Sequence, residues 1–329
     1  MSRFLVTGCA GFIGSHLCEA LNARGDSIVG VDAFTDYYDR STKERNIAPM
    51  RGRDDVELIE ADLTDVAIDD LIVGCDGVFH LAAQPGVRGS FGATFARYAS
   101  DNIIATQRLF EAASRAGIRA VWASSSSVYG NAASYPTRED ALPVPISPYG
   151  VTKLTCEHLA GAYAASAGLD AVAMRFFTVY GPRQRPDMAF TRIATALSTG
   201  GTFRVFGSGA QSRDVTYVSD AVAATIAAME RGAPGTAYNI GGGSETSLNE
   251  AIAMFEGFSE RTLDVVYAPA ATGDVRRTAA DTTVACADLN WEPQVAIEDG
   301  IRAQLAWVMV GDGSSVPSDE SSEMTPRAR

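Results

Sequence analysis

A glycine-rich turn near the N-terminus constrains the fold of this chain most strongly. Gly8, Gly11 and Gly14 follow the short apolar run 4–7 and precede apolar residues at helical spacing that continue to Gly25. A strand that enters such a turn and leaves as a helix lets backbone N–H groups approach a pyrophosphate at the helix N-terminus. The spacing is one residue longer than Gly-x-Gly-x-x-Gly, and an ordinary tight turn could carry the same residues. The turn therefore suggests a dinucleotide-binding unit, and other features must support it.

The apolar pattern of the first 180 residues predicts alternating strands and helices. The predicted strands are 4–7, 27–34, 56–62, 77–83, 120–125 and 170–177, and the predicted helices are 66–73, 102–116 and 149–167. Short, almost continuously apolar strands separated by helices indicate a parallel sheet covered on both faces. We expect an α/β, doubly wound, Rossmann-like fold. The polar stretch 36–55 interrupts this rhythm and is predicted to be a surface insertion.

The composition changes after residue 180, where arginines are scattered among shorter elements. We predict a dinucleotide-binding domain over 1–180, with later segments returning to it, and a smaller C-terminal substrate-binding lobe over 181–310. Residues 311–329 are rich in Ser, Pro and charged residues and are expected to form a disordered tail.

Charge and composition exclude several classes of function. The chain has 40 acidic and 27 basic residues, a net charge of −13, which argues against nucleic acid or an anionic membrane as partner. Its 5 cysteines and 3 histidines do not cluster at metal-ligand spacing, so we expect no metal site and a reduced, cytoplasmic chain. No apolar stretch approaches the length of a membrane span, and the first apolar run is too short for a signal peptide.

Asp32 supports the dinucleotide interpretation. It ends the second predicted strand about 20 residues beyond the glycines, where a carboxylate can accept both hydroxyls of an adenosine ribose. The same carboxylate would repel a 2′-phosphate, so NAD is favoured over NADP. Alternatively, Asp32 caps the strand end. Asp62 and Leu63, after the third strand, are weaker candidates for the adenine edge.

A second group of residues suggests acid–base chemistry. The serine run 124–127 follows a predicted strand, and Tyr149 and Lys153 lie four residues apart on the next helix, so their side chains point the same way. A lysine ammonium favours the phenolate form of a nearby tyrosine, which could then act as a general base on a substrate hydroxyl. Taken alone, a tyrosine and a lysine at this spacing are better explained by an exposed helix face. Together with the glycine-rich turn and the serine run, they indicate catalysis.

Several segments together resemble a known family. TGCAGFIGSHL, HLAAQPGVRGS, SSSSVYG, YGVTK and RFFTVYGPRQRPDMA are similar to the extended short-chain dehydrogenase/reductase superfamily, and specifically to its NAD-dependent nucleotide-sugar epimerases. DAFTDYYDRSTKERN and AAQPGVR resemble most closely the UDP-glucuronate 4-epimerase branch. The resemblance covers about residues 3 to 310.

This resemblance implies a tightly held NAD and a UDP-sugar substrate. Tyr149 would take the proton of the sugar 4-hydroxyl while hydride passes from C4 to NAD, Lys153 would assist, and Ser125 would support proton transfer. The 4-keto sugar would turn within the site and take the hydride back on its other face. The resemblance also implies a homodimer built on helices 102–116 and 149–167.

The contacts that the resemblance implies fall into two sets. Cofactor contacts are expected from Gly8, Gly11, Phe12, Ile13, Gly14, Asp32, Asp62, Leu63, Leu81, Ala82, Ala83, Gln84, Ser124, Tyr149 and Lys153. Substrate contacts are expected from Arg88, Ser125, Ser126, Ser127, Tyr149, Thr178, Arg185, Met188, Arg192, Arg213 and Arg276. Arginine suits the latter because its guanidinium pairs with phosphate through two hydrogen bonds. Gln84 stands where some relatives carry lysine.

The residues after Ser125 bear on the reaction. Related dehydratases carry acidic residues there and related decarboxylases a glutamate, whereas this chain has Ser126 and Ser127. Hydroxyls are poor acids and bases but good donors to a carboxylate. We hypothesise that these serines and Thr178 bind a uronate carboxylate, although some of these hydroxyls could simply cap turns.

The same motifs are compatible with other functions. A UDP-glucose/UDP-galactose 4-epimerase or a UDP-glucuronate decarboxylase would share most of these motifs. A nucleotide sensor without catalysis would be expected to lack Tyr149 or Lys153, and a net dehydrogenase would consume free NAD.

Overall fold

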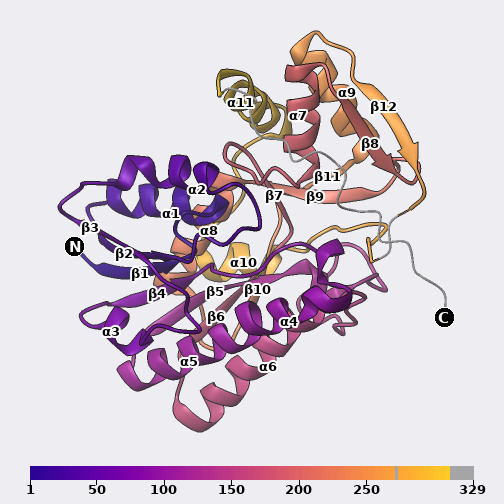
Figure 1. The fold of residues 1–329 in the computed structure, drawn as a ribbon. Coiled ribbons are helices and arrows are strands. Elements are labelled where there is room, and N and C mark those ends of the chain that lie inside the picture. Colours follow the sequence, from indigo (N-terminus) through magenta and orange to yellow (C-terminus); the bar gives the residue numbers. More distant parts are fainter. Residues whose placement is uncertain (271–272, 312–329) are drawn as a thin grey trace.

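The computed structural model describes residues 1–270 and 273–311, and within them a seven-stranded parallel sheet is the largest element (Figure 1). Its strands in spatial order are β10 (Ala237–Ile240), β6 (Ala171–Phe176), β5 (Arg119–Ser125), β4 (Gly77–His80), β1 (Arg3–Thr7), β2 (Ser27–Asp32) and β3 (Val56–Glu60). The chain winds outward from β1 through β2 and β3, then returns to β4 beside β1. Such a reversal opens a crevice at the carboxyl ends of the strands. The predicted Rossmann-like α/β fold is confirmed.

Helices cover both faces of this sheet. The elements on one face are α1 (Phe12–Ala23), α2 (Arg40–Ile47), α8 (Val218–Arg231) and α10 (Thr283–Leu289), and those on the other are α3 (Ile68–Ile72), α5 (Ala105–Ala116) and α6 (Pro148–Ala167). Two buried clusters of apolar side chains, one on each face, hold these layers together. The central strands are therefore largely apolar, which is why they could be recognised from sequence.

The predicted surface insertion at 36–55 is wrong. This stretch contains α2 and a short 3₁₀ turn, Ala48–Met50, and it connects the parallel strands β2 and β3. Ile47 and Met50 are buried in the cluster beside α1. The sequence pattern did not indicate this helix because two of its buried residues, Lys43 and Asn46, are polar. Hydrogen bonds stabilise them in the interior.

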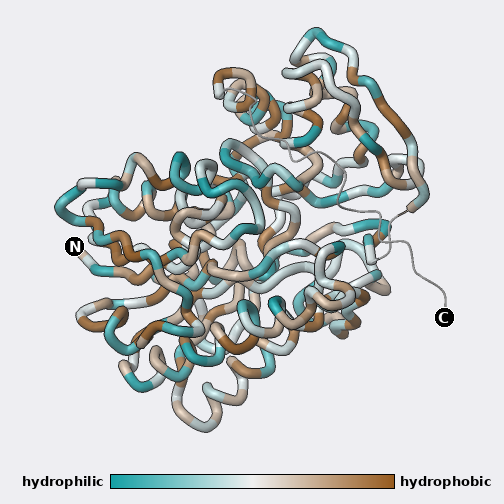
Figure 2. The backbone as a smooth tube through the Cα atoms, in the orientation of Figure 1, coloured by the Kyte–Doolittle hydropathy of each residue, from teal (hydrophilic) through white to brown (hydrophobic). Residues whose placement is uncertain are grey.

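The later part of the chain builds a second group of elements. Its strands are β7 (Thr178–Tyr180), β9 (Ser212–Tyr217) and β11 (Ser244–Ser247) in one sheet, and β8 (Thr202–Phe206) and β12 (Asp264–Ala268) in another. Its helices are α7 (Ala189–Thr199), α9 (Leu248–Ser259) and α11 (Ile297–Val310). These elements share an apolar cluster of their own, and Figure 2 shows hydrophobic stretches both here and in the large sheet.

Several segments after residue 180 join the large sheet. β10 pairs with β6, and α8 and α10 pack on the sheet. Apart from Gly311, the predicted disordered tail lies outside the described residues.

His80, at the end of β4, yields a prediction for stability against pH. Its Nδ1 lies 2.7 Å from Thr7 Oγ1 and its Nε2 2.9 Å from Thr106 Oγ1. Burial lowers its pKa from 6.5 to about 3, so the folded state resists protonation that the unfolded chain accepts. Above pH 6.5, neutral His80 makes its full contribution to the free energy of unfolding. This contribution is lost as the pH falls from 6.5 toward 3, by about 1 kcal/mol per pH unit.

Urea unfolding at pH 7.5 and 5.5 measures this loss. The wild type should lose more stability between the two pH values than His80→Gln, because the other titrating groups contribute equally to both proteins. Equal losses in the two proteins would contradict the assignment of this pH dependence to His80.

Candidate functional site

A cavity of about 740 Å³ lies where the carboxyl ends of β1, β2, β4 and β5 face the second group of elements. The predicted cofactor residues all line it, namely Gly8, Gly11, Phe12, Ile13, Gly14, Asp32, Asp62, Leu63, Leu81, Ala82, Ala83, Gln84, Ser124, Tyr149 and Lys153. The predicted substrate residues that line it are Arg88, Ser125, Ser126, Ser127, Thr178, Arg185, Met188, Arg192 and Arg213. Segments as far apart in sequence as Gly8 and Arg213 thus form one site.

The structure does not bring Arg276 into this cavity. Its carbonyl accepts from the Ser212 N–H at 3.1 Å, and its own N–H donates to Asn131 Oδ1 at 3.3 Å. This backbone pairing leaves the Arg276 side chain exposed, so the expected substrate contact from this residue is not supported by the geometry.

The glycine-rich turn forms a close-fitting cradle. Gly8 has a φ of +70°, and a Cβ there would lie 2.8 Å from the Ala82 nitrogen. A Cβ on Gly14 would overlap the Gly8 carbonyl. α1 begins at Phe12 with Gly11 as its N-cap, so the first N–H groups of the helix have no side-chain cap. Small residues and a helix N-terminus facing a cavity fit the pyrophosphate of a dinucleotide.

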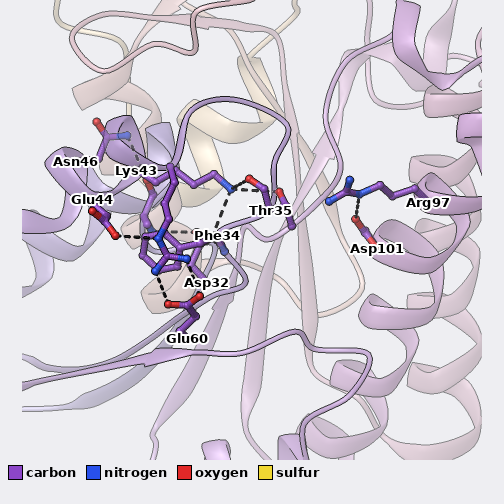
Figure 3. A network of polar contacts seen from close by, with 11 residues as sticks. Asp32, Phe34, Thr35, Lys43, Glu44, Asn46, Glu60, Arg97 and Asp101 are labelled. Carbon is purple, nitrogen blue, oxygen red and sulfur yellow. Dashed lines mark hydrogen bonds and ion pairs between the residues drawn. The ribbon is translucent and has the colours of Figure 1, made fainter. Parts of the chain in front are cut away.

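Asp32, which is predicted to bind the ribose, lies in the wall of the same cavity (Figure 3). Its carboxylate accepts from the Phe34 N–H at 2.8 Å and from the Ala10 N–H at 3.2 Å, and it lies 3.8 Å from Lys43 Nζ. Lys43 also donates to the Thr35 carbonyl at 3.1 Å and to its hydroxyl at 3.2 Å. Burial lowers the pKa of Lys43, and Asp32 partly opposes that shift. These contacts fix the carboxylate in the cavity wall.

Tyr149 and Lys153 lie on the first turns of α6. Ser147 caps this helix, since its hydroxyl accepts from the Gly150 N–H at 3.1 Å. Lys153 Nζ donates to the Ala123 carbonyl of β5 at 2.8 Å and lies 5.9 Å from the centroid of the Tyr149 ring. Lys153 is 4% exposed, so the two side chains do not form an exposed helix face. The arrangement places an ammonium group beside a phenol at the cavity.

The serine run turns sharply at the end of β5. A short 3₁₀ turn, Ser126–Tyr129, follows, and the Ser125 hydroxyl accepts from the Ser127 N–H at 3.1 Å. Ser126 and Ser127 also line a smaller adjoining cavity of about 160 Å³, together with Thr178 and Arg213. Hydroxyls and a guanidinium therefore converge next to the tyrosine and lysine.

Several arginines line the cavity despite the acidic composition, and two of them are paired with carboxylates. Arg88 pairs with Asp274 at 2.6 Å, and Arg185 binds Asp187 through two hydrogen bonds of 2.9 Å. Burial lowers the pKa of Arg213, which donates to the Ser212 carbonyl at 2.8 Å. Guanidinium groups held in this way can exchange a carboxylate partner for a phosphate.

Sequence reasoning missed several residues that line the cavity, including Tyr37, Tyr38, Lys43, Asp187 and Asp274. Three of them lie in or near the stretch that was expected to be a surface insertion. Asp187 stands within the RQRPDMA segment, between two predicted contacts, and its position there was the signal that could have found it.

Comparison with known proteins identifies the family. Residues 4–241 match the model of the NAD dependent epimerase/dehydratase family. The chain belongs to this family. It is 40% identical over 93% of its length to a protein of Bacillus subtilis (strain 168) named as an uncharacterised UDP-glucose epimerase, of which it covers 98%. It is 35% identical over 93% of its length to the UDP-glucuronate 4-epimerase of Thermodesulfobacterium geofontis, of which it covers 96%.

A solved structure of this epimerase family is also similar. The UDP-glucuronic acid 4-epimerase of Bacillus cereus, in complex with UDP-glucuronic acid and NAD, superposes with a TM-score of 0.90. The two sequences are 39% identical, and the match covers 93% of this chain and 98% of the other.

The described residues contain neither a membrane-spanning helix nor a candidate metal cluster. Over 1–270 and 273–311, no helix combines the length and the apolar character needed to cross a bilayer. The same part of the chain holds no cluster of three or more His, Cys, Asp or Glu side chains placed to bind a metal ion.

Proposed function

We propose that this epimerase interconverts UDP-glucuronate and UDP-galacturonate by reversible oxidation at C4 of the sugar. The observation that carries the proposal is the convergence of Ser126, Ser127 and Thr178 beside Tyr149 and Lys153 in one cavity. The first three suit a sugar carboxylate, and the last two suit proton transfer. The similarity to a structure that holds UDP-glucuronic acid and NAD supports the same assignment.

The site supplies the parts that C4 oxidation needs. NAD, when bound along the glycine cradle and Asp32, serves as a reversible hydride acceptor. Tyr149 accepts the proton of the 4-hydroxyl and later returns it, and Lys153 stabilises the phenolate with its charge. Ser125, held at the end of β5, shares a hydrogen bond with the reacting oxygen. Because the hydride returns to the sugar, the reaction has no net redox change.

The carboxylate contacts would also prevent a side reaction. A 4-keto glucuronate is a β-keto acid and loses CO₂ when its C5–carboxylate bond stands perpendicular to the keto plane. Ser126, Ser127 and Thr178 would hold the carboxylate away from that alignment. Ser126→Ala and Thr178→Ala should each lower epimerisation about 10-fold, as expected for a lost hydrogen bond to a charged group, and should release UDP-pentose. Full uronate activity without UDP-pentose, by NMR of the products, would count against this role.

A substrate comparison tests the proposed function as a whole. Purified protein is incubated with UDP-glucuronate or with UDP-glucose, without added cofactor, and the products are identified by NMR. We expect UDP-galacturonate to form faster than UDP-galactose. A preference for UDP-glucose would favour the UDP-glucose/UDP-galactose 4-epimerase, UDP-pentose as main product would favour the decarboxylase, and accumulating NADH would favour a net dehydrogenase.

Asp32 should determine the choice between NAD and NADP. Asp32→Asn removes the charge that repels a 2′-phosphate and leaves Lys43 Nζ, now 3.8 Å from that carboxylate, able to pair with the phosphate. NAD affinity should fall about 10-fold or more, because charged hydrogen bonds contribute about 1.5–3 kcal/mol, and NADP affinity should rise. Calorimetric titration of the apoprotein with each dinucleotide measures both changes. An unchanged ratio of the two affinities would contradict this role.

The proposal also includes a homodimer and a division of the chain into two binding regions. The chain would act as a cytoplasmic homodimer, with 1–180 mainly binding NAD and 181–310 mainly binding the UDP-sugar. Exposed apolar side chains support the dimer: Ile104 is 51% exposed beside α5, and Val151 is 45% exposed on α6. Val151→Glu should then shift the protein toward monomer in light scattering. A monomeric wild type would refute the dimer without affecting the chemistry.

A further inference from the structure

Tyr98 is buried behind the cavity wall, and none of the roles above involves it. It ends α4 (Phe95–Tyr98), is 1% exposed, and is not among the residues that line the cavity. A six-residue π-helical segment, Ala99–Ile104, follows directly. π-Helical turns of this kind are frequent near functional sites. Tyr98 lies directly before this segment, and its contacts connect it to the cavity.

The hydroxyl of Tyr98 holds one loop of the cavity. It donates toward the carbonyls of Pro85 and Gly86, each 2.8 Å away. The loop passes so close that a Cβ on Gly89 would lie 3.0 Å from the same hydroxyl. Burial raises the pKa of Tyr98, so the hydroxyl keeps its proton as a donor. We call residues 84–89 the arginine loop, because it carries Arg88.

The arginine loop reaches across the cavity. At its start, Asn102 binds both the N–H and the carbonyl of Gln84, at 2.7 and 3.1 Å. Near its end, Arg88 pairs with Asp274 at 2.6 Å and lies 4.3 Å from the ring centroid of Phe206 in the second group of elements. Between these two points, the hydroxyl of Tyr98 holds the loop backbone, and it sets where Arg88 can reach.

The ring of Tyr98 contacts the reacting residue. Its centroid lies 6.4 Å from that of Tyr149, with the ring planes at 78°, which is the edge-to-face arrangement that aromatic pairs prefer. One side chain therefore supports both the phenol that exchanges the proton and the loop that carries a substrate-facing arginine.

We propose that Tyr98 is a positioning residue that aligns the arginine loop with Tyr149, through its hydroxyl for the loop and its ring for the tyrosine. This inference rests on the proposed function, since it assigns Arg88 to substrate binding. The proposed role predicts separate effects on KM and on kcat, whereas a merely structural residue would affect both together. Loss of the hydroxyl should weaken substrate binding, and loss of the ring should also slow the chemistry.

Two substitutions test the separation. Tyr98→Phe keeps the ring and removes the donor, so KM should rise about 3- to 10-fold with kcat within about twofold, as expected for one hydrogen bond. Tyr98→Leu removes the ring as well, so kcat should also fall, by about 10- to 100-fold, because Tyr149 loses its alignment. Tyr238→Phe is the matched control: this buried hydroxyl bonds the Ala233 N–H at 3.0 Å and Asp288 at 3.1 Å, outside the cavity, so KM should not change.

A double variant shows whether the rise in KM caused by Tyr98→Phe depends on Arg88. In an Arg88→Ala background, Tyr98→Phe should raise KM by less than twofold, since the residue that the loop positions is already gone. An unchanged KM for Tyr98→Phe, an equal rise in Tyr238→Phe, or a full rise in the Arg88→Ala background would overturn the inference.

The same measurements distinguish this inference from the proposed function. If the wild type turns over UDP-glucose and not UDP-glucuronate, the proposed function fails. The KM ratios, taken on whichever sugar nucleotide is accepted, still decide the role of Tyr98. A second measurement avoids turnover: in a Tyr149→Phe background with NAD bound, Tyr98→Phe should weaken UDP-sugar binding about 3- to 10-fold by calorimetry. Equal affinity in the two proteins would overturn the inference.

Discussion

Tyr149→Phe should abolish epimerisation while leaving NAD binding intact. The phenyl ring cannot accept the proton of the 4-hydroxyl, and loss of a positioned acid–base group costs about 10²–10⁴-fold in rate. The substitution leaves the local structure in place, because Lys153 is held independently by the Ala123 carbonyl at 2.8 Å. The rate is measured by NMR with UDP-glucuronate, and the bound NAD is measured by absorbance after the protein is denatured.

A matched control lies on the same helix. Tyr163 is on α6 and its hydroxyl contacts Gln107 at 2.5 Å, away from the cavity, so Tyr163→Phe should keep its activity. If Tyr149→Phe retained more than a small fraction of wild-type turnover, Tyr149 would not be the proton acceptor. Loss of NAD from Tyr149→Phe would instead show that the residue acts mainly in cofactor binding.

Arg175→Met should destabilise the fold by about 3–5 kcal/mol, which is the usual cost of leaving one member of a buried ion pair alone. Arg175 on β6 binds Glu157 on α6 through two hydrogen bonds of 2.9 and 2.8 Å, and the side chains are only 7% and 12% exposed. Arg175 also donates to the Tyr129 hydroxyl at 2.6 Å, and Glu157 accepts from Ser124 at 2.6 Å. The pair thus connects helix, sheet and serine run directly behind the site.

Urea unfolding of single and double variants tests this expectation. Glu157→Gln combined with Arg175→Met should be more stable than Arg175→Met alone, because no uncompensated charge remains buried. Arg115→Met is the control for an exposed pair, with Asp69 at 2.8 Å, and should change stability little. If Arg175→Met and Arg115→Met were equally stable, the buried Arg175–Glu157 pair would not stabilise the fold as proposed.

The parts of the fold that could be predicted are those governed by apolar burial. The central strands are covered on both faces, so their apolar runs were visible, and the strands end within three residues of the expected positions. Tyr149, Lys153 and the glycines were also found, because their spacing follows from helix and turn geometry. Local rules therefore sufficed to place the glycine turn, Tyr149 and Lys153 in one cavity, whereas their roles rest on the resemblance and the proposal.

Other features depend on contacts between distant segments. α2 buries Lys43 against Asp32 and Thr35, and a polar helix stabilised in this way leaves no apolar pattern in the sequence. Arg276 is exposed and does not line the cavity, and its backbone pairs with Ser212, a residue far away in sequence. Tyr98 shows the same limit, since its contacts to the arginine loop and to Tyr149 exist only in the folded chain.

Isotope retention at C4 tests the central claim most directly. UDP-glucuronate carrying deuterium at C4 is incubated with the purified protein, and the product is examined by NMR and mass spectrometry. Because the hydride leaves and returns within one closed site, UDP-galacturonate should keep the deuterium at C4, and no NAD should be consumed. Loss of the deuterium to water, or a product that forms only as added NAD is reduced, would contradict the account.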